Sequence, residues 1–94
     1  MTIPFAAHAV VPAGVLMQEL DGESVFLNLA NECYYGLDEV GTRMWKVLTG
    51  SESIESAYRE LRNEYDVEAA VLRQDLIRLV GELQKHGLVE LEGG

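Results

Sequence analysis

The segment that decides the fold runs from residue 15 to residue 37 and reads VLMQELDGESVFLNLANECYYGL. Two short apolar runs, residues 15–20 and 24–29, flank Asp21-Gly22-Glu23, and an Asp-Gly pair in that position is a strong hairpin signal. A second polar turn at residues 30–32 leads into Cys33-Tyr34-Tyr35-Gly36-Leu37. The pattern therefore predicts a three-stranded antiparallel meander over residues 15–37.

After residue 37 the apolar spacing changes from two residues to 3.6, which predicts helices. The first helix is expected to begin after an Asp38 N-cap and to end at Gly50, and the second to begin near Ser53. The third is expected from about Glu68 to His86, with Gly87 after it. The expected apolar faces are Val40, Met44, Val47 and Leu48, with Trp45 beside them in the core; Ile54, Ala57, Tyr58, Leu61 and Tyr65; and Val71, Leu72, Leu76, Leu79, Val80 and Leu83.

The two ends of the chain complete the expected architecture. Residues 1–14 contain Pro4 and Pro12, which disfavour a regular ladder, so they are expected to form an irregular arm or a short edge segment. Residues 88–91 are compatible with a short final strand. The prediction is a single α+β domain over residues 1–94, with a β-meander at 15–37 and a three-helix, winged-helix-like part at 38–91.

Composition limits the classes of function. The chain of 94 residues has a formal net charge of −9 and one cysteine, and its acidic residues are spread over both halves. Phosphate backbones and anionic membranes are bound by clustered Lys and Arg, so we expect neither nucleic acid nor a membrane as a partner. A single cysteine allows no internal disulfide, and the N-terminus lacks the features of a signal peptide, so we expect a cytoplasmic protein.

Signals for catalysis or for a metal are weak. Cys33 has no histidine near it in sequence and is expected to be a small buried hydrophobe, and the two histidines, His8 and His86, do not have metal-ligand spacing. We therefore expect no catalytic residue, no metal and no cofactor. Asp75 lies near the edge of the apolar face of the third helix, where it can pair with Arg78 or contact a ligand.

The predicted strand at residues 33–37 is an edge of the meander and has no internal charge or proline. Natural sheet edges are normally protected by such residues, so this edge is open to pairing with an extended peptide through main-chain hydrogen bonds. Self-pairing with a second copy is the alternative. A winged-helix DNA reader would need a basic third helix and wing, whereas Glu90 and Glu92 make the final strand acidic.

The ordered set of motifs resembles the PqqD-like family, the stand-alone recognition elements for precursors of ribosomally made, modified peptides. The resemblance covers residues 15–91. It depends on the run from Val25 to Leu29 and on the segment from Cys33 to Trp45. The matching positions are Leu37-Asp38, Gly41, Trp45, Gly50, Ser53-Ile54-Glu55, Tyr65-Asp66-Val67, Asp75 and Gly87-Leu88-Val89.

This resemblance implies that a leader peptide binds as a fourth strand, in a cleft between the third strand and the third helix. Carried over by position, the peptide-binding residues are Cys33, Tyr34, Tyr35, Gly36 and Leu37 on the strand, and Leu72, Arg73, Asp75, Leu76, Arg78 and Leu79 on the helix. Tyr34 and Tyr35 project to opposite faces of the strand, so at most one lines the cleft. Replacing Leu76 with a charged residue is expected to weaken leader binding and to leave the fold largely intact.

Within the family, the segment from Tyr34 to Asp38 is similar to proteins of lasso-peptide pathways, in which the partners are a leader peptidase and a macrocyclase. The alternative is a pyrroloquinoline quinone pathway, in which the partner is a radical SAM enzyme. Either resemblance implies a non-catalytic peptide-binding protein, as a monomer or a weak homodimer. Two further alternatives are a winged-helix DNA-binding regulator and a small redox protein that uses Cys33.

Overall fold

The computed structural model describes residues 3–93, which form two small sheets and three helices. The strands are β1 (His8–Val10), β2 (Val15–Leu20), β3 (Glu23–Asn28), β4 (Cys33–Leu37) and β5 (Glu90–Glu92), and the helices are α1 (Glu39–Gly50), α2 (Ile54–Glu64) and α3 (Ala69–Lys85). The larger sheet has the order β2-β3-β4 and is antiparallel. The predicted α+β architecture is confirmed, and β4 is an edge strand as expected.

The β2–β3 turn has the backbone that its sequence predicts. Asp21 and Gly22 have φ angles of 54° and 85°, so both central residues of this two-residue connection lie in the left-handed region. That conformation is typical of a type I′ turn, whose twist matches that of the flanking strands. The turn fixes the register in which Leu20 pairs with Glu23 and Met17 with Phe26.

The arm at the N-terminus contains a regular strand. β1 pairs antiparallel with β5, with Ala9 opposite Leu91, so the short-edge-segment alternative is confirmed for residues 8–10. Before this strand, the carbonyl groups of Phe5 and Ala7 accept hydrogen bonds from Glu55 and Ile54. These bonds satisfy main-chain N–H groups in the first turn of α2, which have no partner within the helix.

Helix boundaries follow the predicted capping residues. The Asp38 carboxylate accepts a hydrogen bond from the Gly41 N–H at 2.8 Å, and the Ser53 hydroxyl accepts one from the Ser56 N–H at 3.1 Å. Helix α3 begins and ends within a residue of the expected positions, with Gly87 at φ 70° after it. A left-handed residue after a helix is the commonest helix stop.

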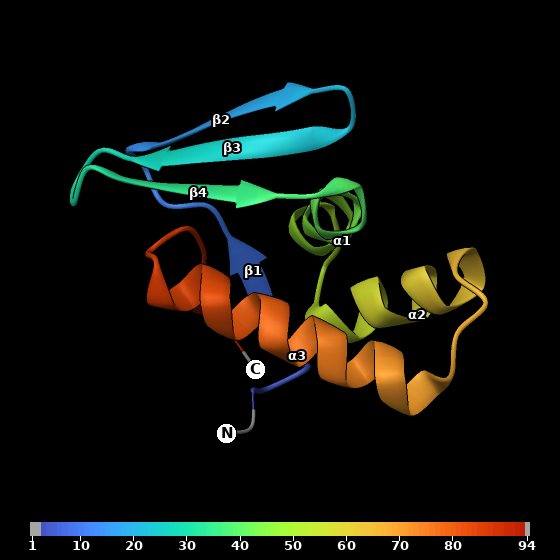
Figure 1. Ribbon diagram of the computed structural model, residues 1–94. Helices are drawn as coiled ribbons and strands as arrows, with labels where there is room; N and C mark the ends of the chain where they lie inside the picture. The colour runs from blue at the N-terminus through green and yellow to red at the C-terminus, as the bar shows by residue number, and fades with distance from the viewer. Residues whose placement is uncertain (1–2, 94) are drawn as a thin grey trace.

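The core lies between the inner face of the larger sheet and the three helices (Figure 1). Phe26 is fully buried and packs edge-on against Trp45, with ring centroids 5.0 Å apart. The expectation that Val40 and Val71 belong to the core is wrong, because their exposed fractions are 49% and 48%. Thr42 is buried instead and hydrogen-bonds to Ser24 at 2.7 Å.

Candidate peptide-binding edge

Alternation along β3 separates a buried face of the sheet from an exposed one. Ser24, Phe26 and Asn28 are buried, whereas Val25 between them is half exposed. Because Tyr35 pairs with Phe26 and Tyr34 with Leu27, Tyr35 lies on the inner face and Tyr34 on the outer face. Tyr34 is 73% exposed. Tyr35 is therefore the tyrosine that faces the helices.

The hydrogen-bonding pattern of the sheet determines which residues of β4 direct their main-chain N–H and C=O groups to the free edge. The Leu29 N–H donates to the Gly14 carbonyl at 2.9 Å, so odd-numbered residues of β3 bond to β2. Successive residues of an antiparallel strand bond to opposite neighbours, so Phe26 bonds toward Tyr35 of β4. The N–H and C=O groups of Tyr34 and Gly36 consequently point to the free edge.

Helix α3 lies beside this edge, and β4 is the strand of the sheet drawn nearest to it (Figure 1). The Tyr35 ring packs against the His86 ring with a centroid separation of 4.6 Å. The Asn28 side-chain amide donates to the carbonyl groups of His86 and Gly87 at 3.0 and 3.2 Å. A Cβ at Gly87 would lie 2.6 Å from the Asn28 Nδ2, so only glycine allows this approach.

One strip of α3 faces the β4 side. Positions 75, 79, 82 and 86 lie one above another on a helix with 3.6 residues per turn, and His86 marks the side on which β4 lies. The His86 Nε2 is 3.6 Å from a Glu82 carboxylate oxygen. Burial and, to a smaller extent, the Glu82 charge raise the pKa of the Tyr35 hydroxyl above its ordinary value of 10.0. Sequence reasoning missed Glu82 and His86, although helical spacing from Asp75 and Leu79 identifies both.

Only part of the expected helix face is available to a ligand. Leu72 and Leu76 are 1% and 0% exposed, so they belong to the core and offer no surface to a peptide. Leu79 and Asp75 are partly exposed and remain candidates. The predicted Asp75–Arg78 pair is present at 3.8 Å, between side chains that are 44% and 73% exposed, and such a pair contributes little stability.

Two further expectations are corrected. Arg73 lies on the opposite flank of α3 from His86, with its guanidinium 4.1 Å from the centre of the Phe5 ring, so it faces the N-terminal segment and not β4. Cys33 is exposed, not buried, because it begins the edge strand directly after a turn. Its N–H donates to the Asn31 side chain, which closes that turn.

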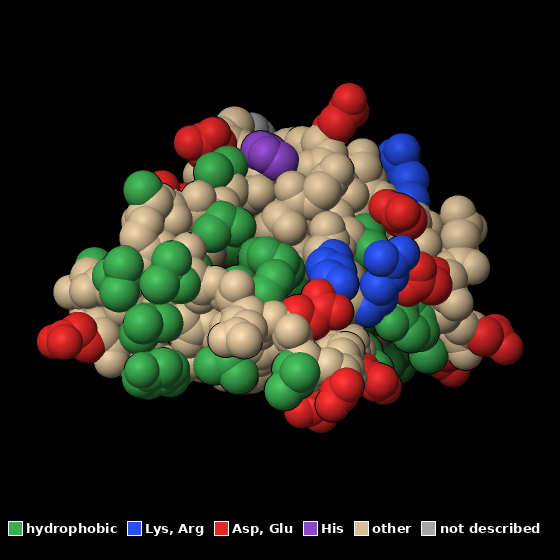
Figure 2. All heavy atoms as spheres, turned by 90° about the horizontal axis from the view of Figure 1, so that it is seen from above, with side chains coloured by type: hydrophobic (Ala, Val, Ile, Leu, Met, Phe, Trp, Pro, Cys, Tyr) green, Lys and Arg blue, Asp and Glu red, His purple; other side chains and the backbone are tan. Residues whose placement is uncertain are grey.

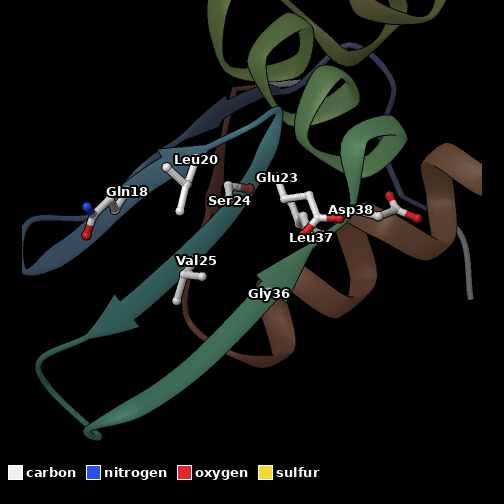
Figure 3. A pocket seen from close by; sticks show the side chains of 8 residues that line it. All are labelled: Gln18, Leu20, Glu23, Ser24, Val25, Gly36, Leu37 and Asp38. Carbon is white, nitrogen blue, oxygen red and sulfur yellow. The ribbon is translucent and has the colours of Figure 1, made fainter.

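The outer face of the sheet carries exposed apolar side chains and a shallow hollow. Figure 2 shows hydrophobic side chains gathered over the strands, with Lys and Arg side chains toward the helices. The hollow has a volume of about 560 Å³ and opens over β3 and β4 (Figure 3). Its lining residues are Gln18, Leu20, Glu23, Ser24, Val25, Gly36, Leu37 and Asp38.

Residues 3–93 contain neither a cluster of metal ligands nor a helix that could span a membrane. Within this range, no three His, Cys, Asp or Glu side chains are grouped so that they could hold a metal ion. None of the helices described there has the length and apolar character needed to span a bilayer.

The fold and the open β4 edge beside α3 define a small α+β domain of the kind predicted from the sequence. The family model described as coenzyme PQQ synthesis protein D (PqqD) matches residues 23–89. The chain belongs to this family. Comparison with curated protein sequences gives no significant match.

Two solved structures have the same fold. One shows TbiB1 in complex with the TbiA(beta) leader peptide; it is 30% identical, with a TM-score of 0.79, over 86% of this chain and 94% of that one. The other shows a lasso peptide synthetase B1 complexed with the leader peptide; it is 21% identical, with a TM-score of 0.79, over 89% of this chain and 99% of that one.

Proposed function

We propose that this protein binds the leader segment of a ribosomally synthesised precursor peptide and presents it to maturation enzymes, without catalysing a reaction itself. The observation that carries the proposal is the uncovered β4 edge, where the main-chain groups of Tyr34 and Gly36 point away from the sheet. An extended peptide added there satisfies these groups and extends the sheet by one strand. The similar TbiB1 was solved with a leader peptide bound, which supports this choice of ligand.

Side chains of the bound peptide on the inner face would enter the space between β4 and α3. Tyr35 and Leu79 offer apolar surface there, and Asp75, Glu82 and Arg78 offer charge. Main-chain pairing supplies affinity with little dependence on sequence, so these side chains supply the selection among peptides. We include Cys33 and Leu37 at the two ends of the strand, and we leave out Arg73, Leu72 and Leu76 as direct contacts.

Presentation requires a surface that stays free when the leader is bound. The part of the outer face outside the hollow meets this requirement, because Leu16 and Tyr34 are 54% and 73% exposed and do not line the hollow. Contiguous apolar surface of this kind on a small protein is typical of an interaction site. We propose that a leader peptidase and a macrocyclase of a lasso-type pathway are the partners.

The PqqD family description supports a second candidate, in which the same edge holds a precursor for a radical SAM enzyme of pyrroloquinoline quinone synthesis. We take the lasso-type pathway first, because both similar solved structures hold a leader peptide and one of them is a lasso peptide synthetase B1. Both candidates use the β4 edge, and they differ only in the precursor and in the enzyme that receives it.

Calorimetric titration with two synthetic leader peptides tests the function and separates the candidates. One peptide is the leader of the precursor encoded beside this chain, and the other is a scrambled version of equal charge. We expect saturable binding of the first, with a negative heat-capacity change from buried apolar surface, and none of the second. Equal binding of both peptides, or no binding of either to folded protein, would refute the proposal.

A further inference from the structure

The hollow on the outer face reaches the free edge of β4 at Gly36. Gly36 pairs with Val25 of β3 and has no side chain, so the outer surface drops between Val25 and the edge of the sheet (Figure 3). A Cβ built at Gly36 would have only the Ser24 carbonyl oxygen within 4 Å, at 3.8 Å. The protein packing therefore does not require glycine here.

The backbone conformation does not require glycine either, since Gly36 is not among the glycines with positive φ. Glycine in a strand costs stability and often marks a close approach by another group. On one face of a sheet, residues directly opposite on neighbouring strands lie about 4.5–5.5 Å apart between Cβ atoms. A strand added to β4 would place one outward side chain opposite Gly36.

From this geometry we infer that the bound leader carries a large apolar side chain opposite Gly36, which crosses the glycine and fills the hollow against Val25 and Leu20. The inference rests on the proposed leader binding and adds a second point of selection, on the face opposite to α3. An aromatic residue that covers a cross-strand glycine is a known stabilising arrangement in sheets.

The rim of the hollow defines which side chains it accepts. Val25 and Leu20 provide an exposed apolar floor, and Glu23 and Asp38 provide carboxylates at its border. An apolar ring or branched chain covers the floor, whereas an acidic side chain would meet like charge. The expected order at this leader position is therefore aromatic, then leucine, then alanine, with aspartate the weakest.

A double-mutant cycle tests the inference with the full-length chain and the synthetic leader of the precursor encoded beside it. Cross-strand nuclear Overhauser contacts to Gly36 identify the leader residue opposite it, which is then replaced by Ala. We expect Val25→Ser or Gly36→Val to weaken leader binding about tenfold, and the alanine leader to abolish the difference between wild type and Val25→Ser. Leu16→Ser is the matched control, because Leu16 is equally exposed on the same face but does not line this hollow.

Each result has one meaning. Tight binding that is insensitive to Val25→Ser and Gly36→Val overturns the inference and leaves leader binding intact. The same holds if the two variants affect only the rate of a partner enzyme, or only self-association measured by sedimentation, because the occupant is then the partner or a second copy. Failure of the wild-type protein to bind the leader refutes the proposed function itself.

Discussion

The two edges of the larger sheet, β2 and β4, have similar backbones and different surroundings. Both have alternate main-chain groups that point outward, and neither contains proline. β4 lies beside α3, with its Tyr35 ring packed on His86, whereas five of the six residues of β2 are exposed. Of the two edges, only β4 has a second element beside it that can offer a wall to the side chains of an added peptide.

The largest effect is expected at the buried face of α3, which belongs to the core and not to the β4 edge. Leu76→Asp places a charge at a fully buried position and should cost about 4 kcal/mol or more of unfolding free energy, which is enough to unfold a small domain. Leu79→Asp, one turn away in part-exposed surroundings, should keep the fold and weaken leader binding about tenfold. Chemical denaturation and calorimetry measure the two effects. This corrects the sequence-based expectation that a charge at position 76 leaves the fold largely intact, and a folded Leu76→Asp variant with normal stability would contradict the assignment of Leu76 to the core.

The next effect distinguishes the two edges directly. Gly36→Pro removes an N–H that points to the free edge of β4, so it should leave the sheet intact and weaken leader binding roughly a hundredfold, by lost hydrogen bonding and by steric conflict. Met17→Pro makes the same change at the free edge of β2 and should alter binding less than about twofold. Gly36→Ala keeps the N–H and controls for the loss of glycine. Similar losses for the two proline variants would show that the leader does not select β4.

The sequence was sufficient for the strands, the helices and the identity of the open edge, because each depends on local signals. The Asp21-Gly22 turn, the Asp38 and Ser53 caps and the Gly87 stop all lie where the sequence predicts them. Alternation also predicted that Tyr34 and Tyr35 occupy opposite faces, and the register assigns the inner face to Tyr35.

The site was predicted less completely, because its errors concern tertiary packing. An apolar stripe shows that a helix has a buried face but not how far that face extends, so the sequence predicts Leu72 and Leu76 as cleft residues, whereas the structure buries both. Arg73 was assigned to the cleft because the side of α3 that meets β4 cannot be read from periodicity. The residue type alone predicts a buried Cys33, and its position directly after a turn overrides that preference.

A smaller effect is expected where β3, the neighbour of β4, is attached to the end of α3. Asn28 donates two hydrogen bonds to the end of α3 and accepts one from the Ala30 N–H, so Asn28→Ala should cost about 2 kcal/mol and lower the melting temperature by roughly 10 °C. Asn31→Ala, which removes an exposed turn contact to Cys33, should cost less than about 1 kcal/mol. Equal changes in melting temperature would show that Asn28 does not hold the two elements together.

The smallest effect is in the alkaline pH dependence. A phenol whose pKa is raised in the folded chain keeps its proton there while the unfolded chain loses it, so stability falls as the pH rises above 10. Tyr35 and Tyr65 both contribute, and only Tyr35 lies beside the β4 edge. Bound leader should raise the pKa of Tyr35 further and leave that of Tyr65 unchanged, as ultraviolet titration of the Tyr35→Phe and Tyr65→Phe variants would report. A leader-induced pKa shift that is lost in Tyr65→Phe and kept in Tyr35→Phe would contradict leader binding at the β4 edge.

Amide hydrogen exchange with and without the leader peptide tests the central claim most directly. The account predicts that the Tyr34 and Gly36 amides exchange rapidly in the free protein and become protected when leader binds, while the Met17 amide at the β2 edge does not change. Protection at Met17, or saturable leader binding with no protection at Tyr34 and Gly36, would contradict strand addition at β4.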